Sequence, residues 1–239
     1  MRRHLDLTAL VVFAIMLYDH AVFAQEPSSD GVLFEKNIEY SNPDEQHLQL
    51  NMARPQHGKG PFPVIVCIHG GGFRAGSREG FNGLCQQLAK HGYVAVTVSY
   101  RLAPKYPFPA AIYDVKAAVR WVRANAEKYN MDAGRVGTTG GSAGGHLAQY
   151  LGVTRGIERF EGDGGNPQYS SHVDCVVNFY GPSDFTKSYD ASVDAAEVLP
   201  LFLGGNLEEE KQRLAQTGRR RQGPQDGHCV RGAAEARAG

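Results

Sequence analysis

Two glycine-rich segments combine residue types that suit nucleophilic chemistry. The first is Gly140-Gly141-Ser142-Ala143-Gly144, a G-x-S-x-G motif between an apolar segment and a helical pattern. In a nucleophile elbow the serine occupies a sharp, strained turn from strand to helix, and small neighbours let the two elements pack closely. Ser142 is therefore the candidate nucleophile, and Gly140 and Gly144 are expected to be structural residues beside it.

The second segment, "HGGGF", begins at His69 and follows the apolar run 64–68. The transition state of acyl transfer carries negative charge on the former carbonyl oxygen, and losing one N–H donor to that oxygen costs about 3 to 4 kcal/mol. Bare glycines let a backbone approach that closely. We therefore expect an oxyanion hole from the N–H groups of Gly71, Gly72 and Ala143. His69 could be a base, but its place at a strand end favours a structural histidine that orients the loop.

Alternating strands and helices must position these two segments. Apolar runs predict buried strands at 63–69, 93–100, 135–142 and 172–181, and helical patterns cover 77–90, 110–130 and 143–151. Such alternation indicates right-handed βαβ units and a parallel sheet with helices on both faces. Two short alternating segments within 37–55 predict an antiparallel hairpin ahead of it. The expected fold class is therefore α/β, with a mostly parallel sheet.

Composition and charge give no indication of a nucleic-acid, anionic-membrane or metal partner. The chain has 239 residues, 42% of them hydrophobic, and Lys+Arg equals Asp+Glu at 25 each. This balance gives no reason to expect a nucleic-acid partner. No CxxC spacing suggests a metal site. Cys67 and Cys175 lie in apolar runs that predict buried free thiols, and Cys85 is expected on the apolar face of a helix.

The N-terminus has the pattern of a secretory signal. A basic start precedes an apolar stretch at 7–17, and Val22-Phe23-Ala24 stands before a polar segment. A spanning helix needs roughly 20 residues, so no stable membrane insertion is expected, although an uncleaved anchor remains an alternative. We expect residues 1–24 to be a cleavable signal peptide, which implies a secreted or periplasmic protein.

A family resemblance rests on four segments that follow one another in this order: "HGGGF", "YRLAPKYPFPAAIYDVKAAVRWVRANA", "RVGTTGGSAGGHLA" and "NFYGPSDF". From about residue 37 to 207 the chain resembles the α/β-hydrolase esterases of the hormone-sensitive-lipase and acetyl-xylan or feruloyl-esterase-like group. The resemblance implies a serine carboxylesterase for short acyl or aryl esters that needs no cofactor. "GGSAGG" leans toward the carbohydrate-esterase-like branch, with a small-molecule or carbohydrate ester as substrate. The family resemblance also implies that His146 and Asp114 are packing residues.

The expected acid and base depart from the family pattern. In this fold they follow the serine in the order Asp or Glu, then His. His228 alone lies far enough downstream, in a segment from Gln216 onward that has no Leu, Ile, Phe, Tyr, Trp or Met. We therefore expect 25–216 to be a C-terminally incomplete α/β-hydrolase domain and 217–239 a disordered or out-of-frame tail. Asp226 and His228 remain substitute candidates for acid and base, and activity is expected near background without a base.

Two other functions remain compatible with the same residues. An amidase or peptidase of this fold uses the same elbow, and a non-catalytic binding protein could retain it without a base. The sequence gives no indication of oligomeric state.

Overall fold

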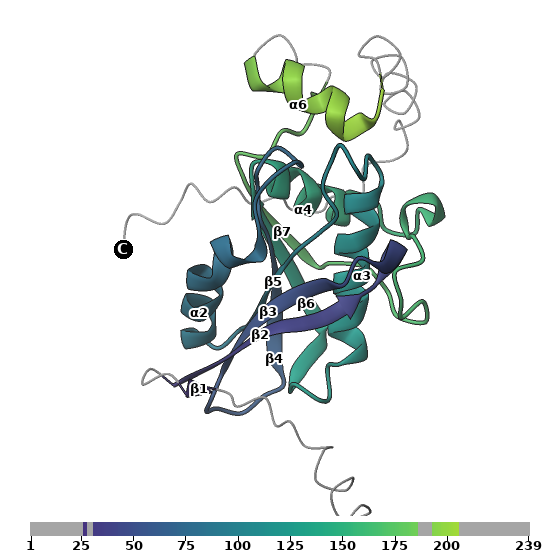
Figure 1. The fold of residues 1–239 in the computed structure, drawn as a ribbon. Coiled ribbons are helices and arrows are strands. Elements are labelled where there is room, and N and C mark those ends of the chain that lie inside the picture. The colour runs from purple at the N-terminus through teal and green to yellow at the C-terminus, as the bar shows by residue number, and fades with distance from the viewer. Residues whose placement is uncertain (1–25, 28–30, 186–192, 206–239) are drawn as a thin grey trace, which may run out of the picture.

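Seven strands form one mixed sheet in this computed structural model, which describes residues 26–27, 31–185 and 193–205 (Figure 1). The strand order is β1-β2-β3-β5-β4-β6-β7. The strands are β1 Glu26–Pro27, β2 Val32–Ser41, β3 Leu48–Pro55, β4 Phe62–Ile68, β5 Val94–Val98, β6 Met131–Gly141 and β7 Cys175–Phe179.

The sheet divides into an antiparallel and a parallel part. β1, β2 and β3 pair antiparallel with one another, and β3 joins β5 in the same sense. β5, β4, β6 and β7 are mutually parallel. This arrangement confirms the predicted α/β sheet led by an antiparallel hairpin. The carboxyl ends of β4 and β6 therefore lie side by side, with Ile68 paired to Gly140.

Helices cover the two faces of the sheet. α2 lies on one side, and α3 lies on the other (Figure 1). α4 contacts α3, β6 and β7. The α-helices are α2 Asn82–Lys90, α3 Ala110–Ala124, α4 Ala143–Val153 and α6 Val193–Leu203, with short 3-10 turns η1 Pro43–Glu45, η2 Arg78–Phe81 and η3 Glu158–Phe160.

The alternation of side chains along β4 divides the core in two. Val64, Val66 and Ile68 are fully buried in the larger cluster, which includes the apolar residues of α3 and α4. Cys67 points to the smaller cluster, which includes Cys85 of α2. Burial on both faces explains why the parallel strands read as almost continuous apolar runs.

Several predicted boundaries differ from the structure. The helix expected at 77–90 begins with the 3-10 turn η2, and its α-helical part starts at Asn82. The helix expected to reach 130 ends at Ala124. The prediction that Cys175 is buried was wrong, because β7 is the last strand of the described sheet and its thiol is exposed. Cys67 and Cys85 are buried as predicted.

Some predictions fall on parts of the chain outside the described residues. The signal segment 1–24, the tail 217–239 and the end of the domain at 216 are among them. Those boundaries therefore stay predictions. Within the described ranges, no helix combines the length and the hydrophobicity that a membrane span requires.

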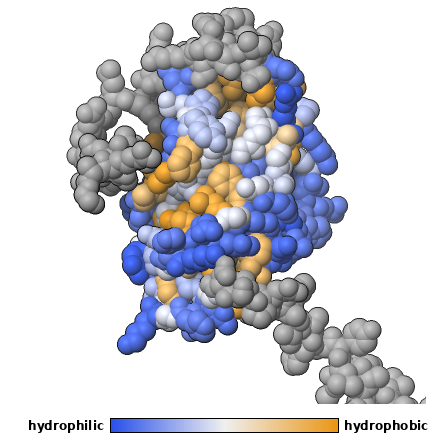
Figure 2. Space-filling view, turned by 90° about the vertical axis from the view of Figure 1, so that its left-hand side faces the viewer, coloured by the Kyte–Doolittle hydropathy of each residue, from blue (hydrophilic) through white to orange (hydrophobic). Residues whose placement is uncertain are grey.

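Apolar side chains remain exposed along β7 and just beyond it. Val177 is 36% exposed, Phe179 42% and Tyr180 84%. Figure 2, which views the molecule from the side of α2, shows apolar surface among hydrophilic regions on that face. Exposed edge strands with apolar side chains favour association between molecules.

A buried ion pair fixes α3 to the segment that follows β5. The Arg101 guanidinium donates to both carboxylate oxygens of Asp114, at 2.8 to 3.0 Å, and the Arg101 backbone N–H donates to the same carboxylate at 2.8 Å. Their side chains are 8% and 2% exposed. Asp114 is thus a structural residue that fixes the position of α3 relative to the segment after β5.

We predict that Asp114→Ala lowers the free energy of unfolding by about 3 to 5 kcal/mol, because it leaves a buried guanidinium without its main partner. Urea denaturation measures this loss. Asp132→Ala is the matched control, because Asp132 pairs with Arg135 at the surface and surface pairs contribute little. Equal stability losses in the two variants would contradict the role assigned to Asp114.

Candidate active site

Ser142 occupies a strained turn between β6 and α4. Its φ of 53° and ψ of −122° lie outside the regions that non-glycine residues favour. The turn is fixed on both sides: the Ser142 N–H donates to the carbonyl of Phe179 at 3.0 Å, and the His146 N–H donates to the carbonyl of Ser142 at 3.1 Å. The geometry is that of the nucleophile elbow that the sequence predicts.

Glycines beside Ser142 let α4 approach the end of β4. A Cβ on Gly140 would lie 2.8 Å from the carbonyl oxygen of Ile68, and one on Gly144 would overlap the same oxygen. Real Cβ atoms essentially never come within 3.0 Å of another heavy atom in this way. Gly140 and Gly144 are therefore required by the close packing of β6, α4 and β4, as expected.

The triple-glycine loop lies directly against the elbow. A Cβ on Gly70 would be 3.3 Å from the Cβ of Ser142 and 2.7 Å from the carbonyl oxygen of Gly141. This contact follows from the sheet, because β4 and β6 are parallel neighbours and end together. Residues far apart in the sequence thus meet at one edge, where α/β folds place their sites.

The predicted oxyanion donors are two N–H groups of the triple-glycine loop and the N–H of the first residue of α4. Gly71 and Gly72 have φ values of +113° and +59°, which other residues rarely adopt. Within the described residues, the N–H groups of Gly71, Gly72 and Ala143 make no hydrogen bond. Ala143 is the first residue of α4, so the partial positive charge of the helix N-terminus adds to its donor. These three N–H groups are therefore free to donate to a negatively charged oxygen, and their joint action as an oxyanion hole stays a prediction.

His69 anchors the start of this loop. Its Nδ1–H donates to the carbonyl of Gly70 at 2.8 Å, and its ring stacks on Tyr100 with centroids 4.3 Å apart. The Tyr100 hydroxyl also donates to the His69 carbonyl at 2.9 Å. Burial lowers the pKa of His69, so the ring is neutral at pH 7. These contacts give His69 a structural place and supply no link to the Ser142 hydroxyl.

The described residues bring no imidazole to Ser142. Histidines 47, 69, 91, 146 and 172 each hydrogen-bond to other groups, and His57 lies near the opposite edge of the sheet. Asp226 and His228, the candidate acid and base, are outside the described residues. Within the described part of the chain, no imidazole is therefore placed to act as a base for Ser142, and the roles of Asp226 and His228 stay predictions.

His146 lies one turn after Ser142 in a cluster of aromatic rings. Its ring stacks on Phe185 at 4.2 Å and meets the edge of Phe73 at 5.8 Å, and its Nδ1–H donates to the carbonyl of Pro182 at 2.8 Å. Its Nε2 is buried and has no hydrogen-bond partner within the described residues. Burial lowers the pKa of His146 to about 4. The side chain is thus a neutral packing residue, as the resemblance implied.

Helix α6 packs on the triple-glycine loop, a contact that sequence reasoning missed. Phe202 of α6 stacks on Phe73 with ring centroids 3.8 Å apart, and a Cβ on Gly72 would lie 3.2 Å from Val198. Glu197 forms an ion pair with Arg74. Phe73 has a φ of 60° and is buried. Phe73, the aromatic residue directly after "HGGG", could have indicated that this loop packs against another element. The sequence does not show that its partner is Phe202.

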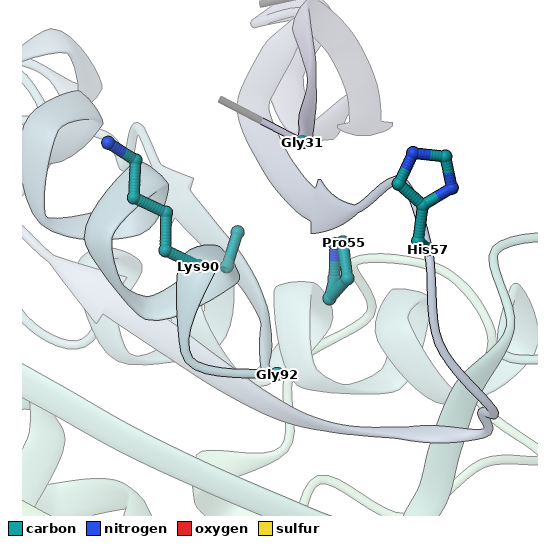
Figure 3. A pocket seen from close by; sticks show the side chains of 6 residues that line it. Gly31, Pro55, His57, Lys90 and Gly92 are labelled. Carbon is teal, nitrogen blue, oxygen red and sulfur yellow. The ribbon is translucent and has the colours of Figure 1, made fainter. Parts of the chain in front are cut away.

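A separate depression of about 490 Å³ lies near the start of β5, at the end of the sheet opposite to Ser142 (Figure 3). Figure 3 shows the Lys90 ammonium and the His57 imidazole on opposite sides of it. Its lining therefore does not converge on one ligand atom, and it has no part in the chemistry at Ser142. It is lined by Gly31, Pro55, His57, Ala89, Lys90 and Gly92.

We predict that Gly144→Ala destabilises the chain by about 3 kcal/mol or more, because the new methyl group overlaps the backbone of β4. Thermal or urea denaturation gives the measurement. Gly83→Ala in α2 is the control, because nothing lies within 4 Å of its Cβ position. That variant should be neutral or gain up to about 1 kcal/mol from helix propensity. A Gly144→Ala chain as stable as the control would contradict the packing described for the elbow.

Stability should also depend on pH through His146. The folded chain keeps this histidine neutral down to about pH 4, whereas the unfolded chain protonates it near its ordinary pKa of about 6.5. The unfolded state therefore binds more protons between these values, and stability falls as pH drops through that window. We expect a loss on the order of 3 kcal/mol between pH 7 and pH 4.

His146→Phe should flatten most of this slope, with a smaller part remaining from His69. His91→Gln, at an exposed histidine, should leave the slope unchanged. Urea denaturation at several pH values measures both. A slope that survives in His146→Phe would mean that other groups cause it.

Comparison with known proteins agrees with this geometry. The sequence profile of the BD-FAE family matches residues 50–218, more than half of the chain. Esterase LipC of Mycobacterium tuberculosis is 37% identical over 128 residues, which cover 52% of this chain and 31% of LipC. The chain thus spans less than a third of the length of that relative.

Solved structures of esterases share the fold. A truncated carbohydrate esterase from gut microbiota has a TM-score of 0.61 and 33% identity, over 67% of this chain and 61% of that one. Esterase B from Lactobacillus rhamnosis has a TM-score of 0.66 and 27% identity, over 86% of this chain and 67% of that one. With its elbow, its glycine loop and its sheet order, the chain has the α/β-hydrolase fold and belongs to the BD-FAE family.

Proposed function

We propose that this chain is a serine carboxylesterase for short-chain acyl or aryl esters. The observation that carries the proposal is the Ser142 turn, with its strained φ of 53° and the glycine loop in contact with it. Ester hydrolases among the similar proteins support the reaction class. The carbohydrate esterase among the structural neighbours supports a carbohydrate ester as one class of substrate.

The reaction would pass through an acyl-enzyme. The Ser142 oxygen attacks the ester carbonyl and its proton leaves to a base, which gives a tetrahedral intermediate. The oxyanion accepts hydrogen bonds from the N–H groups of Gly71, Gly72 and Ala143. The alcohol then departs with a proton, and water hydrolyses the acyl group from Ser142 by the same steps in reverse order.

The base sets how fast this chain reacts. No described imidazole hydrogen-bonds to the Ser142 hydroxyl, so we place the acid and the base outside the described ranges, with Asp226 and His228 as the candidates within this chain. Without a positioned base, catalysis falls to what binding and the oxyanion hole supply. A small external base should then restore part of the rate.

We predict that hydrolysis of p-nitrophenyl acetate by the full chain depends on Ser142 and increases when imidazole is added. Ser142→Ala should show only the hydrolysis that imidazole itself causes. His228→Ala tests the tail: a large loss of rate identifies His228 as the base, and an unchanged rate excludes it. Intact mass spectrometry should find the acetyl group on Ser142.

Three outcomes would contradict the proposal. Equal rates for the chain and Ser142→Ala, with and without imidazole, would exclude Ser142 as nucleophile. Faster cleavage of p-nitroacetanilide than of the acetate ester would favour an amidase. Saturable ester binding with no acylation under any condition would favour a non-catalytic binding protein.

A further inference from the structure

The end of the glycine loop packs against its beginning. Gly76 has a φ of +93°, and a Cβ there would lie 2.5 Å from the carbonyl oxygen of Gly70 and 2.7 Å from His69 Nδ1. The N–H groups of Arg74 and Ala75 both donate to the carbonyl of Gly71, at 3.1 and 3.0 Å. The positions of the oxyanion donors therefore depend on where the chain near Gly76 is held.

Arg78, two residues beyond Gly76, is bound to the antiparallel part of the sheet. Its guanidinium makes four hydrogen bonds to neutral side chains that lie on β2, on β3 and just after β5. Nε donates to Asn51 Oδ1 at 3.1 Å, Nη1 to Ser99 Oγ at 3.0 Å, and Nη2 to Asn37 Oδ1 at 2.5 Å and Gln49 Oε1 at 3.0 Å.

The partners of Arg78 are themselves fixed. Asn51 is fully buried, and its Oδ1 also accepts the N–H of Asn37 at 3.0 Å. Asn37 has a φ of 59° and lies at an irregularity in the pairing of β2 with β3. Thr97 Oγ1 donates to the backbone carbonyl of Arg78 at 2.8 Å. Both the side chain and the backbone of Arg78 are therefore held by a preformed set of polar groups.

The four acceptors around Arg78 fit the planar, branched shape of a guanidinium group. Four acceptors in different directions match its fixed array of N–H donors, whereas a lysine offers a single point of charge. The nearest ion-paired carboxylate, Glu79, is 3.4 Å away with a side chain 53% exposed. The arrangement of its hydrogen-bond donors therefore explains an arginine at position 78 better than its positive charge does.

We propose that Arg78 is a positioning residue for the oxyanion hole, which it holds in place through Gly76 and Gly70. The inference rests on the proposed function, in which Gly71 and Gly72 donate to the oxyanion. Arg78 itself contacts no substrate. Its loss should displace or loosen the donors, and a displacement of about 1 Å at a reacting centre can reduce a rate by about 100-fold.

The test compares Arg78→Met and Arg78→Lys with Arg135→Met, a control at an exposed ion pair near the start of β6. Hydrogen exchange of the full chain, followed by mass spectrometry, reports on the amides of residues 70–77 without any need for turnover. We expect about tenfold faster exchange there in Arg78→Met, with α4 and β6 little changed. Arg78→Lys should fall between this variant and the wild type.

Kinetics give the second measurement. For Ser142-dependent hydrolysis of p-nitrophenyl acetate, Arg78→Met should lower kcat by about 10- to 100-fold with KM changed by less than about threefold, because the oxyanion forms only in the transition state. Ser99→Ala, which removes one acceptor of Arg78, provides a milder variant should Arg78→Met fail to fold. It should show the same pattern with smaller changes.

Loop exchange at the wild-type rate in folded Arg78→Met or Ser99→Ala would overturn the proposal. So would a loss of activity that appears in KM alone. If the unaltered chain shows no Ser142-dependent turnover, the proposed function fails, and the exchange comparison still decides whether Arg78 holds the loop.

Discussion

The contact between the Ser142 turn and the end of β4 constrains the rest of this structure. The chain must pass from β6 into α4 while the first turn of that helix lies against the carbonyl of Ile68, which leaves no space for a side chain at Gly140 or Gly144. The strain at Ser142 persists because hydrogen bonds to Phe179 and His146 fix the backbone on both sides. The result is a serine held apart from the sheet with a helix N-terminus beside it.

The second half of the site is a loop with little regular hydrogen bonding, and it is held at three points. Tyr100 stacks on His69 at its start, the aromatic cluster encloses Phe73 in its middle, and Arg78 fixes its end. Backbone donors that are fixed before the reaction need no reorganisation when charge develops. Because the glycines have no side chains, the loop can lie close to Ser142. The three contacts restrict the backbone conformations that glycine would otherwise sample.

The local features of this site could be predicted from the sequence, and the long-range ones could not. "GGSAGG" and "HGGG" encode turns that only small residues permit, so Ser142 and the loop were found from their immediate neighbours. The polar set around Arg78 joins residues from β2, β3 and β5, whose mutual register depends on the folded sheet. For the same reason the exposure of Cys175 was mispredicted, because an apolar run does not reveal which strand lies at an edge.

The central claim, that Ser142 and the three backbone donors form one reaction site, is tested most directly by a crystal structure of the chain treated with an aryl phosphonate ester. Such a reagent leaves a tetrahedral phosphorus on the reacting oxygen. The account predicts a covalent bond from phosphorus to Ser142 Oγ, with one phosphonyl oxygen about 2.7 to 3.1 Å from the nitrogens of Gly71, Gly72 and Ala143. Attachment to another residue, or a phosphonyl oxygen directed away from those three nitrogens, would contradict it.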